Sequence, residues 1–233
     1  MMQSNEEFVR FHGEGAYGYV HLVRYTNPDG SSFSAAVNNS YSADYDSLQR
    51  ELQILRKLRG CPRIVKCFGD NLEQGLSSYG NKVHKLLLEY ALGSLNAFME
   101  NYIYTDRKLP ESMIKDFTRM ILQEVGQVPD YWEIDFPFVG TLIYMPPESL
   151  RDGVAKKTLD LWSVGCIVLE MHTGVIPWEG VKLGDLTTRL RDGKAPEMPQ
   201  SLPCEAKEFI ETCFSRNHEE REEARVACCV TGF

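Results

Sequence analysis

The run Gly13-Glu14-Gly15-Ala16-Tyr17-Gly18-Tyr19-Val20 has the pattern G-x-G-x-x-G-x-V and lies between two stretches of strand-forming residues. Glycines let a backbone lie close to phosphate oxygens and present its N–H groups to them. The pattern therefore predicts a phosphate-binding turn, although a flexible hairpin without a ligand has the same composition. A dinucleotide-binding turn is disfavoured, because in that motif the glycines open a helix and here they open a second strand.

The sequence on both sides of this run has a strand pattern, which is followed by a helical pattern further along the chain. Residues 8–40 predict short strands, with a tight turn at Asn27-Pro28-Asp29-Gly30. Residues 43–58 have a helical period, and residues 83–90 predict another apolar strand. Four leucines share one face of the predicted helix: Leu48, Leu52, Leu55 and Leu58.

Beyond residue 94 the apolar residues recur mostly at helical steps, so the fold class predicted is α+β with two lobes. A β-rich N-terminal lobe spans residues 8–90, a helical C-terminal lobe spans residues 91–222, and residues 223–233 form a charged tail. Residues 159–174 are apolar on nearly all sides, which predicts a buried central helix. Trp162 and Trp178 are expected in the core.

Composition excludes several classes of function. The 233 residues suit one two-lobed domain, and the net charge of −8 comes without any Lys/Arg-rich run. We therefore expect no nucleic-acid partner and no anionic membrane partner. No apolar stretch reaches the roughly 18–20 residues of a membrane span. Seven scattered cysteines without metal-ligand spacing predict reduced thiols, so we expect a cytoplasmic or nuclear location.

Further residues, taken in chain order, resemble the small lobe of protein kinases. Ala36 lies near the end of a strand, Glu51 lies in the following helix, and Leu88-Glu89 lead into a Gly-Ser linker. The same order of glycine-rich loop, third strand, αC helix and hinge is found in that family. The resemblance implies ATP with magnesium as cofactor and a set of nucleotide-binding positions: Gly13, Glu14, Gly15, Ala16, Gly18, Val20, Ala36, Asn38, Leu88, Glu89 and Ala91.

The second half of the chain resembles the same family. Residues 140–148, from Gly140-Thr141 to Pro147-Glu148, look like the end of an activation segment, and Asp160 looks like the start of the αF helix. Arg221 matches the family arginine that pairs with the glutamate corresponding to Glu148. The residues in and around these motifs resemble plant MAP kinase kinase kinases of the MEKK-like group. Thr141 stands in the Gly-Thr-x-x-Tyr pattern that is typical of Ser/Thr kinases. The resemblance implies MAP kinase kinases, or intact family members, as partners.

Several groups that phosphoryl transfer needs are absent from the sequence. Asn38 occupies the position of the lysine that holds the α- and β-phosphates, so both the phosphates and Glu51 lose a cationic partner. After Gln123 the chain passes directly to residues that look like the middle of an activation segment. No H-R-D-like triplet, catalytic-loop asparagine or D-F-G occurs in the sequence. We therefore predict no catalytic residue and no metal ligand. A substitute metal site at Asp130, Glu133 and Asp135, or at Asp70 after a small-lobe strand, is disfavoured.

Three functions remain open. The chain is a kinase-like interaction module with weak or no ATP binding, an active Ser/Thr kinase of a MAP kinase cascade, or a non-functional product of exon skipping or a faulty gene model. The missing segment also affects folding. Asp160 loses the catalytic-loop backbone that binds it in kinases, which predicts a raised pKa or a cost of roughly 1–3 kcal/mol, and a destabilised protein.

Overall fold

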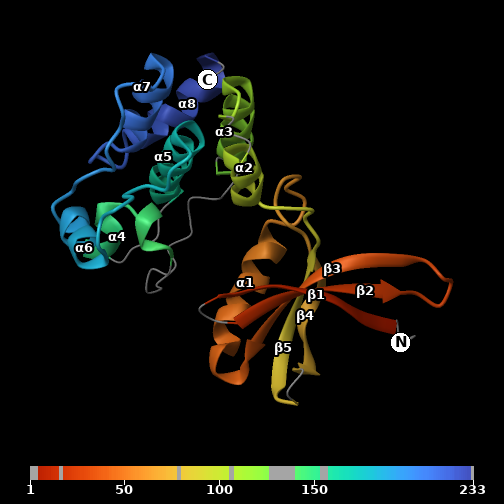
Figure 1. Ribbon diagram of the computed structural model, residues 1–233. Helices are drawn as coiled ribbons and strands as arrows, with labels where there is room; N and C mark the ends of the chain where they lie inside the picture. Colours follow the sequence, from red (N-terminus) through yellow and green to blue (C-terminus); the bar gives the residue numbers. More distant parts are fainter. Residues whose placement is uncertain are drawn as a thin grey trace. The chain divides into compact units, whose positions relative to one another are not determined.

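The structure is a computed structural model that describes residues 5–15, 18–77, 80–104, 108–125, 140–152 and 157–231. It divides the chain into two compact units, Met1–Ser94 and Leu95–Phe233. The first unit holds the strands and the second is helical, as Figure 1 shows. The α+β fold expected from the sequence is present. The boundary falls at Ser94, a few residues after the predicted end of the N-terminal lobe at residue 90.

The first unit is an antiparallel sheet with one helix. The strand order is β1-β2-β3-β5-β4. A short 3-10 turn, Ser42–Asp44, leads from the third strand into the helix. The elements are β1 (Asn5–Gly15), β2 (Gly18–Thr26), β3 (Ser32–Tyr41), α1 (Tyr45–Lys57), β4 (Cys67–Leu76) and β5 (Lys82–Glu89).

Helix α1 packs on the sheet through the leucine face that the sequence predicts. Leu48 and Leu52 are buried in a cluster with Cys67 of β4 and Leu86 of β5, and Leu55 packs at its border. The opposite side of the helix carries charged residues, which is the distribution of an amphipathic surface helix. The positive charges of Arg56 and Lys57 in the last turn stabilise the helix, because its C-terminal end carries the negative end of the helix dipole.

For β4 the sequence predicted only a strand that ends before Asp70, and the structure shows why the pattern of the whole strand is weak. Its pairing with β5 is interrupted between Phe68 and Glu73, and Gly69 has a φ of 84° inside the strand. Most of its side chains are exposed, so apolar residues do not alternate along it. Asp70, which was expected to follow a strand, lies inside β4 and forms an ion pair with Arg59 at 2.9 Å.

The second unit is helical in the part that the structure describes. Helices α4 and α6 lie where the sequence predicted no individual helix. The helices are α2 (Leu95–Tyr104), α3 (Glu111–Val125), α4 (Pro147–Asp152), α5 (Lys157–Thr173), α6 (Leu183–Arg191), α7 (Cys204–Cys213) and α8 (Arg221–Thr231), with a 3-10 turn at Leu142–Tyr144.

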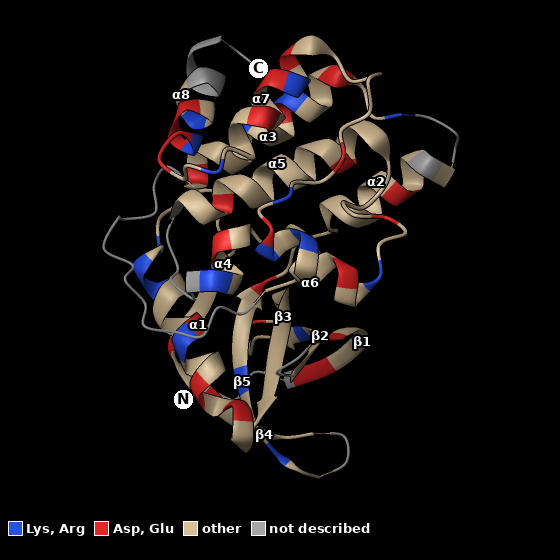
Figure 2. Ribbon diagram, turned by 90° about the vertical axis from the view of Figure 1, so that its left-hand side faces the viewer, with Lys and Arg blue, Asp and Glu red and all other residues tan. Residues whose placement is uncertain are grey.

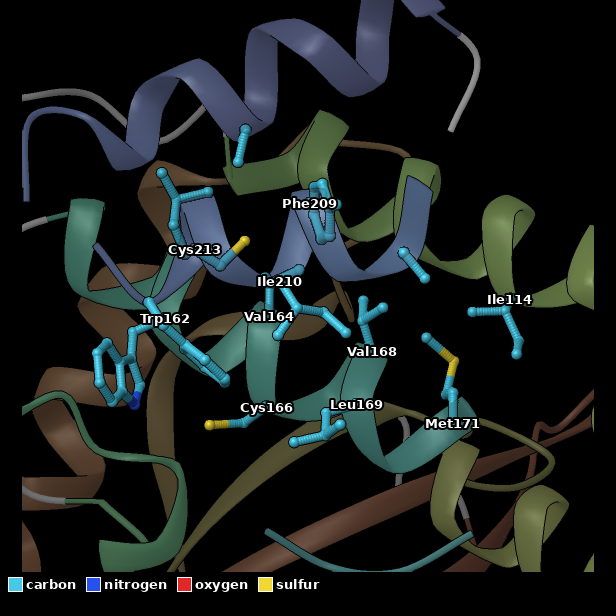
Figure 3. Packing of buried hydrophobic residues seen from close by; sticks show 14 of the residues in the cluster. Ile114, Trp162, Val164, Cys166, Val168, Leu169, Met171, Phe209, Ile210 and Cys213 are labelled. Atoms are coloured by element: carbon cyan, nitrogen blue, oxygen red, sulfur yellow. The ribbon is translucent and has the colours of Figure 1, made fainter. Parts of the chain in front are cut away.

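Helix α5 is the buried centre of this unit, as predicted. Figure 3 shows Val164 and Val168 of α5 beside Ile210 of α7, with Ile114 of α3 close to Met171. Trp162 is 1% exposed in the same cluster, and Trp178 is buried in a smaller cluster with Leu186 and Leu190. Because α5 is apolar on all sides, it can be covered by α3, α7 and α8 together.

The predicted charged tail needs a correction. Residues 221–231 form helix α8, and Ala224 is 1% exposed against the core, so the folded unit extends beyond residue 222. Figure 2 shows acidic residues along α7 and α8. Glu208, Glu211, Glu220 and Glu223 line a groove of about 670 Å³ there, a surface that would repel polyanions. No helix in the described part of the chain is long and apolar enough to cross a membrane.

Candidate functional site

The glycine-rich run forms the hairpin between β1 and β2. Gly13 pairs with Val20, Glu14 with Tyr19 and Gly15 with Gly18. A Cβ at Gly18 would lie 2.0 Å from the carbonyl oxygen of Asn39, so only glycine fits there. A Cβ at Gly13 would meet nothing within 4 Å, and one at Gly15 would only touch the carbonyl oxygen of Gly18 at 3.9 Å, so neither glycine is closely covered. Ala16 lies outside the described residues.

The predicted nucleotide-binding side chains share one face of the sheet. Val20 pairs with Asn38, and Ala36 pairs with Leu88, so these four residues point the same way. Asn38 also pairs with Leu86, which is buried under α1, and this fixes the face as the one that α1 covers. Val20, Ala36 and Leu88 are only half-buried. The sheet therefore presents an incompletely covered apolar strip beside Asn38.

Asn38 binds Glu51, as the lysine it replaces would be expected to do. The Asn38 Nδ2 atom donates to Glu51 Oε2 at 3.0 Å, linking β3 to α1. Burial raises the pKa of the Glu51 carboxyl, and the amide hydrogen bond offsets only part of that effect. No lysine or arginine of the described residues is paired with Glu51. The link between strand and helix is kept, while the positive charge is lost.

The predicted hinge follows β5 directly. The backbone N–H of Glu89 donates to the carbonyl oxygen of Lys66 at 2.7 Å, which holds the end of the strand in place. Arg10 Nη2 donates to the hydroxyl of Tyr90 at 2.8 Å, and the His12 ring lies 5.6 Å from the Tyr90 ring. Ala91 is exposed. Sequence reasoning missed the Arg10 and His12 contacts, since neither residue type is part of the family pattern.

The segment from Thr141 to Glu148 is held by hydrogen bonds to α5. The Tyr144 hydroxyl donates to Glu170 Oε2 at 2.7 Å, and Ser163 Oγ donates to the Tyr144 carbonyl oxygen at 2.9 Å. Thr141 is exposed, and Pro147 is the first residue of α4. The contacts of Tyr144 were not predicted. A spacing of 26 residues between Tyr144 and Glu170 gives no periodic signal from which they could be found.

Glu148 and Arg221 form the predicted pair. Arg221 Nη1 donates to Glu148 Oε1 at 2.5 Å and Nη2 donates to Oε2 at 3.2 Å, which is a bidentate geometry. Arg221 is fully buried, its Nε donates to the carbonyl oxygen of Ser215 at 2.9 Å, and its guanidinium lies 5.1 Å from the centre of the Trp162 ring. The pair ties α4 to α8.

Asp160 is the fourth residue of α5, and none of the described residues donates a hydrogen bond to it. Its surface is exposed, yet the surrounding protein raises its pKa to about 6 by desolvation. The direction agrees with the expectation for a carboxylate that has lost its partner. Because water still reaches it, the effect on stability is smaller than for a sealed carboxylate.

The structure contains little that could hold a metal ion. Within the described ranges no group of three or more His, Cys, Asp or Glu side chains lies close enough to do so. Asp130, Glu133 and Asp135 lie outside those ranges. No disulfide involves the cysteines whose side chains the structure describes, which are Cys61, Cys67, Cys166, Cys204 and Cys213.

A family model for the protein kinase domain matches residues 136–230, the part of the chain that contains Glu148, Asp160 and Arg221. The chain is similar to protein kinases. It is 28% identical to mitogen-activated protein kinase kinase kinase 20 of Arabidopsis thaliana, over 80% of this chain and 65% of that protein. It is 29% identical to mitogen-activated protein kinase kinase kinase 18 of the same plant, over 82% of this chain and 67% of that protein. The serine/threonine-protein kinase Nek4 of Mus musculus is 25% identical, over 97% of this chain and 32% of Nek4.

The alignment with kinase kinase kinase 20 also bears on the missing segment. It runs over 228 positions but uses 80% of 233 residues, or about 186, so about 40 aligned positions of the kinase have no counterpart here. That is consistent with the absence of the H-R-D and D-F-G motifs from the sequence. The chain spans at most about two thirds of the length of these curated kinases.

Proposed function

We propose that this kinase relative does not transfer phosphate and acts by binding components of a MAP kinase cascade in the cytoplasm or nucleus. The observation that carries the proposal is the Asn38–Glu51 contact at 3.0 Å. At this point a kinase needs a fixed cation to hold the phosphates, and an amide supplies none. A chain without the metal-holding D-F-G aspartate cannot compensate for that loss by charge.

A second observation supports the binding part of the proposal. The segment from Thr141 to Glu148 keeps its contacts with α5 and α8 through Tyr144–Glu170 and Glu148–Arg221. Such fixed hydrogen bonds preserve the shape of a surface segment without any catalytic group. The relatives named as MAP kinase kinase kinases make MAP kinase kinases the first partners to test.

The binding test is a pull-down of a purified plant MAP kinase kinase by the full chain. We expect capture, and we expect the kinase domain of kinase kinase kinase 20 to compete for it. A Tyr144→Phe variant tests whether the segment from Thr141 to Glu148 takes part. It removes one hydroxyl contact to Glu170 and leaves the ring in place, so it should weaken capture without unfolding the chain. Absence of capture by a folded chain would exclude this class of partner.

A further inference from the structure

The sheet of the first unit still has the apolar part of a base-binding surface. Val20, Ala36 and Leu88 are half-buried neighbours on one face, so apolar surface of three strands remains available. The rings of His12 and Tyr90 lie 5.6 Å apart beside the hinge. Apolar side chains and aromatic rings favour planar bases, whatever the charge of the rest of the ligand.

The end of this strip at Asn38 has the opposite character. Asn38 lies two residues from Ala36 along β3, which is about 7 Å in an antiparallel strand. There the half-buried Glu51 carboxylate is neutralised by no lysine or arginine of the described residues. Arg10 pairs with Leu22 and so lies level with Ala36 rather than Asn38, and its Nη2 donates to the hydroxyl of Tyr90 at 2.8 Å. A ligand phosphate at the Asn38 end would therefore meet a carboxylate and an amide.

We propose that this strip takes an uncharged purine nucleoside or base in preference to ATP, and that it does so without magnesium. This inference rests on the proposed function, because it concerns the same remnant of a nucleotide site. The base keeps its apolar contacts, whereas each added phosphate brings repulsion from Glu51 with no cation to offset it. Magnesium bound to the phosphates of ATP lowers their charge but finds no metal-holding cluster among the described residues, so we expect it not to reverse the order.

The test is a calorimetric titration of the full chain with adenosine, AMP and ATP, each with and without magnesium. We expect affinity to fall from adenosine to AMP to ATP, with at least about a tenfold difference between the first and the last without magnesium, and the same order with it. Tighter binding of ATP than of adenosine would overturn the inference. So would a failure of all three ligands to bind, which would leave the proposed interaction function standing, because the pull-down tests that separately.

Two variants tie the preference to the Asn38 end. Asn38→Lys supplies the missing cation, and Glu51→Gln removes the carboxylate while it keeps an oxygen that accepts from Asn38. Each should raise the affinity for ATP relative to adenosine by about tenfold. Ser32→Lys is the matched control, since it adds the same charge to an exposed position at the start of β3 and should leave the order unchanged. If both site variants, while folded, keep the wild-type ratio of adenosine affinity to ATP affinity, the inference is wrong.

Discussion

Arg221 is the most deeply buried charged residue in the part of the chain that the structure describes. It is fully buried and bidentate to Glu148, whose side chain is 13% exposed. Arg221→Ala would leave that carboxylate buried without its cation, so we expect a loss of about 3–5 kcal/mol in the free energy of unfolding, measured by urea denaturation. The control is Arg225→Ala on the same helix, whose pair with Glu222 at 3.1 Å is about 30% exposed and should cost under about 1 kcal/mol. Equal losses for the two variants would contradict this account of the pair.

Asp160 gives the protein a pH dependence of a definite sign. Its folded-state pKa of about 6 is above the ordinary value of 3.8, so the folded chain binds more protons than the unfolded chain between these values. Stability linked to this group is present below pH 4 and is lost as the pH rises towards 6 and beyond. We expect Asp160→Asn to raise the melting temperature at pH 7 but not at pH 4. A variant that melts lower than wild type at pH 7 would mean that the carboxylate has a stabilising partner.

The sequence predicted the residues of the site where one local pattern or one family position was enough. The family resemblance assigned Asn38 and Glu51 to the lysine and glutamate positions and predicted that Glu51 loses its cationic partner, but not the hydrogen bond between them. Glu148 and Arg221 lie 73 residues apart, and only the family resemblance joined them. The contacts of Tyr144 with Glu170 and of Arg10 with Tyr90 depend on how separate elements pack, which no local pattern encodes.

At the scale of elements, close packing of α5 against α7 has a direct test. A Cβ at Gly165 in α5 would lie 2.6 Å from the Cβ of Cys213 and 3.0 Å from the ring of Phe214. We expect Gly165→Ala to destabilise the chain by about 1–3 kcal/mol, because the overlap exceeds the gain in helix propensity. Gly184→Ala in α6 is the control. It has nothing within 4 Å and should be neutral or stabilising by up to about 1 kcal/mol in thermal unfolding.

If Gly165→Ala is as stable as the wild type, α5 and α7 can move apart. The core around Trp162 and Ile210 would then be less closely packed than the structure shows. Gly184→Ala as unstable as Gly165→Ala would point instead to a general effect on helices.

The elements that could be predicted are those with a long, regular burial pattern. Helix α1 has a leucine at each buried turn, and α5 is apolar throughout, so both were found. Helix α6 buries only Leu186 and Leu190, which is too short a pattern to separate from a loop. Strand β4 is an irregular, mostly exposed edge strand, so its residues carry no alternation. Helix α8 begins with charged residues, and these concealed the buried side marked by Ala224.

At the scale of the whole molecule, the absent catalytic segment should lower thermal stability. In a kinase that segment covers apolar surface and binds the αF aspartate, whereas Asp160 here has no donor among the described residues. We expect scanning calorimetry to show a melting temperature several degrees below that of the kinase domain of kinase kinase kinase 20, since about 1 kcal/mol shifts a domain of this size by roughly 2–4 °C. Equal melting temperatures would show that the remaining helices close the core without the segment.

The central claim is that the groups present cannot transfer a phosphate, and the most direct measurement is transfer of radioactive phosphate from ATP to a MAP kinase kinase. The assay uses the purified wild-type chain and the Asn38→Lys variant, because that variant restores the one missing group that a single substitution can supply. The account predicts that neither exceeds a preparation without the chain, since the catalytic aspartate and the metal-holding residues are still absent. Turnover of the wild-type chain at about 1 s⁻¹ or faster, in the range of active kinases, would contradict it.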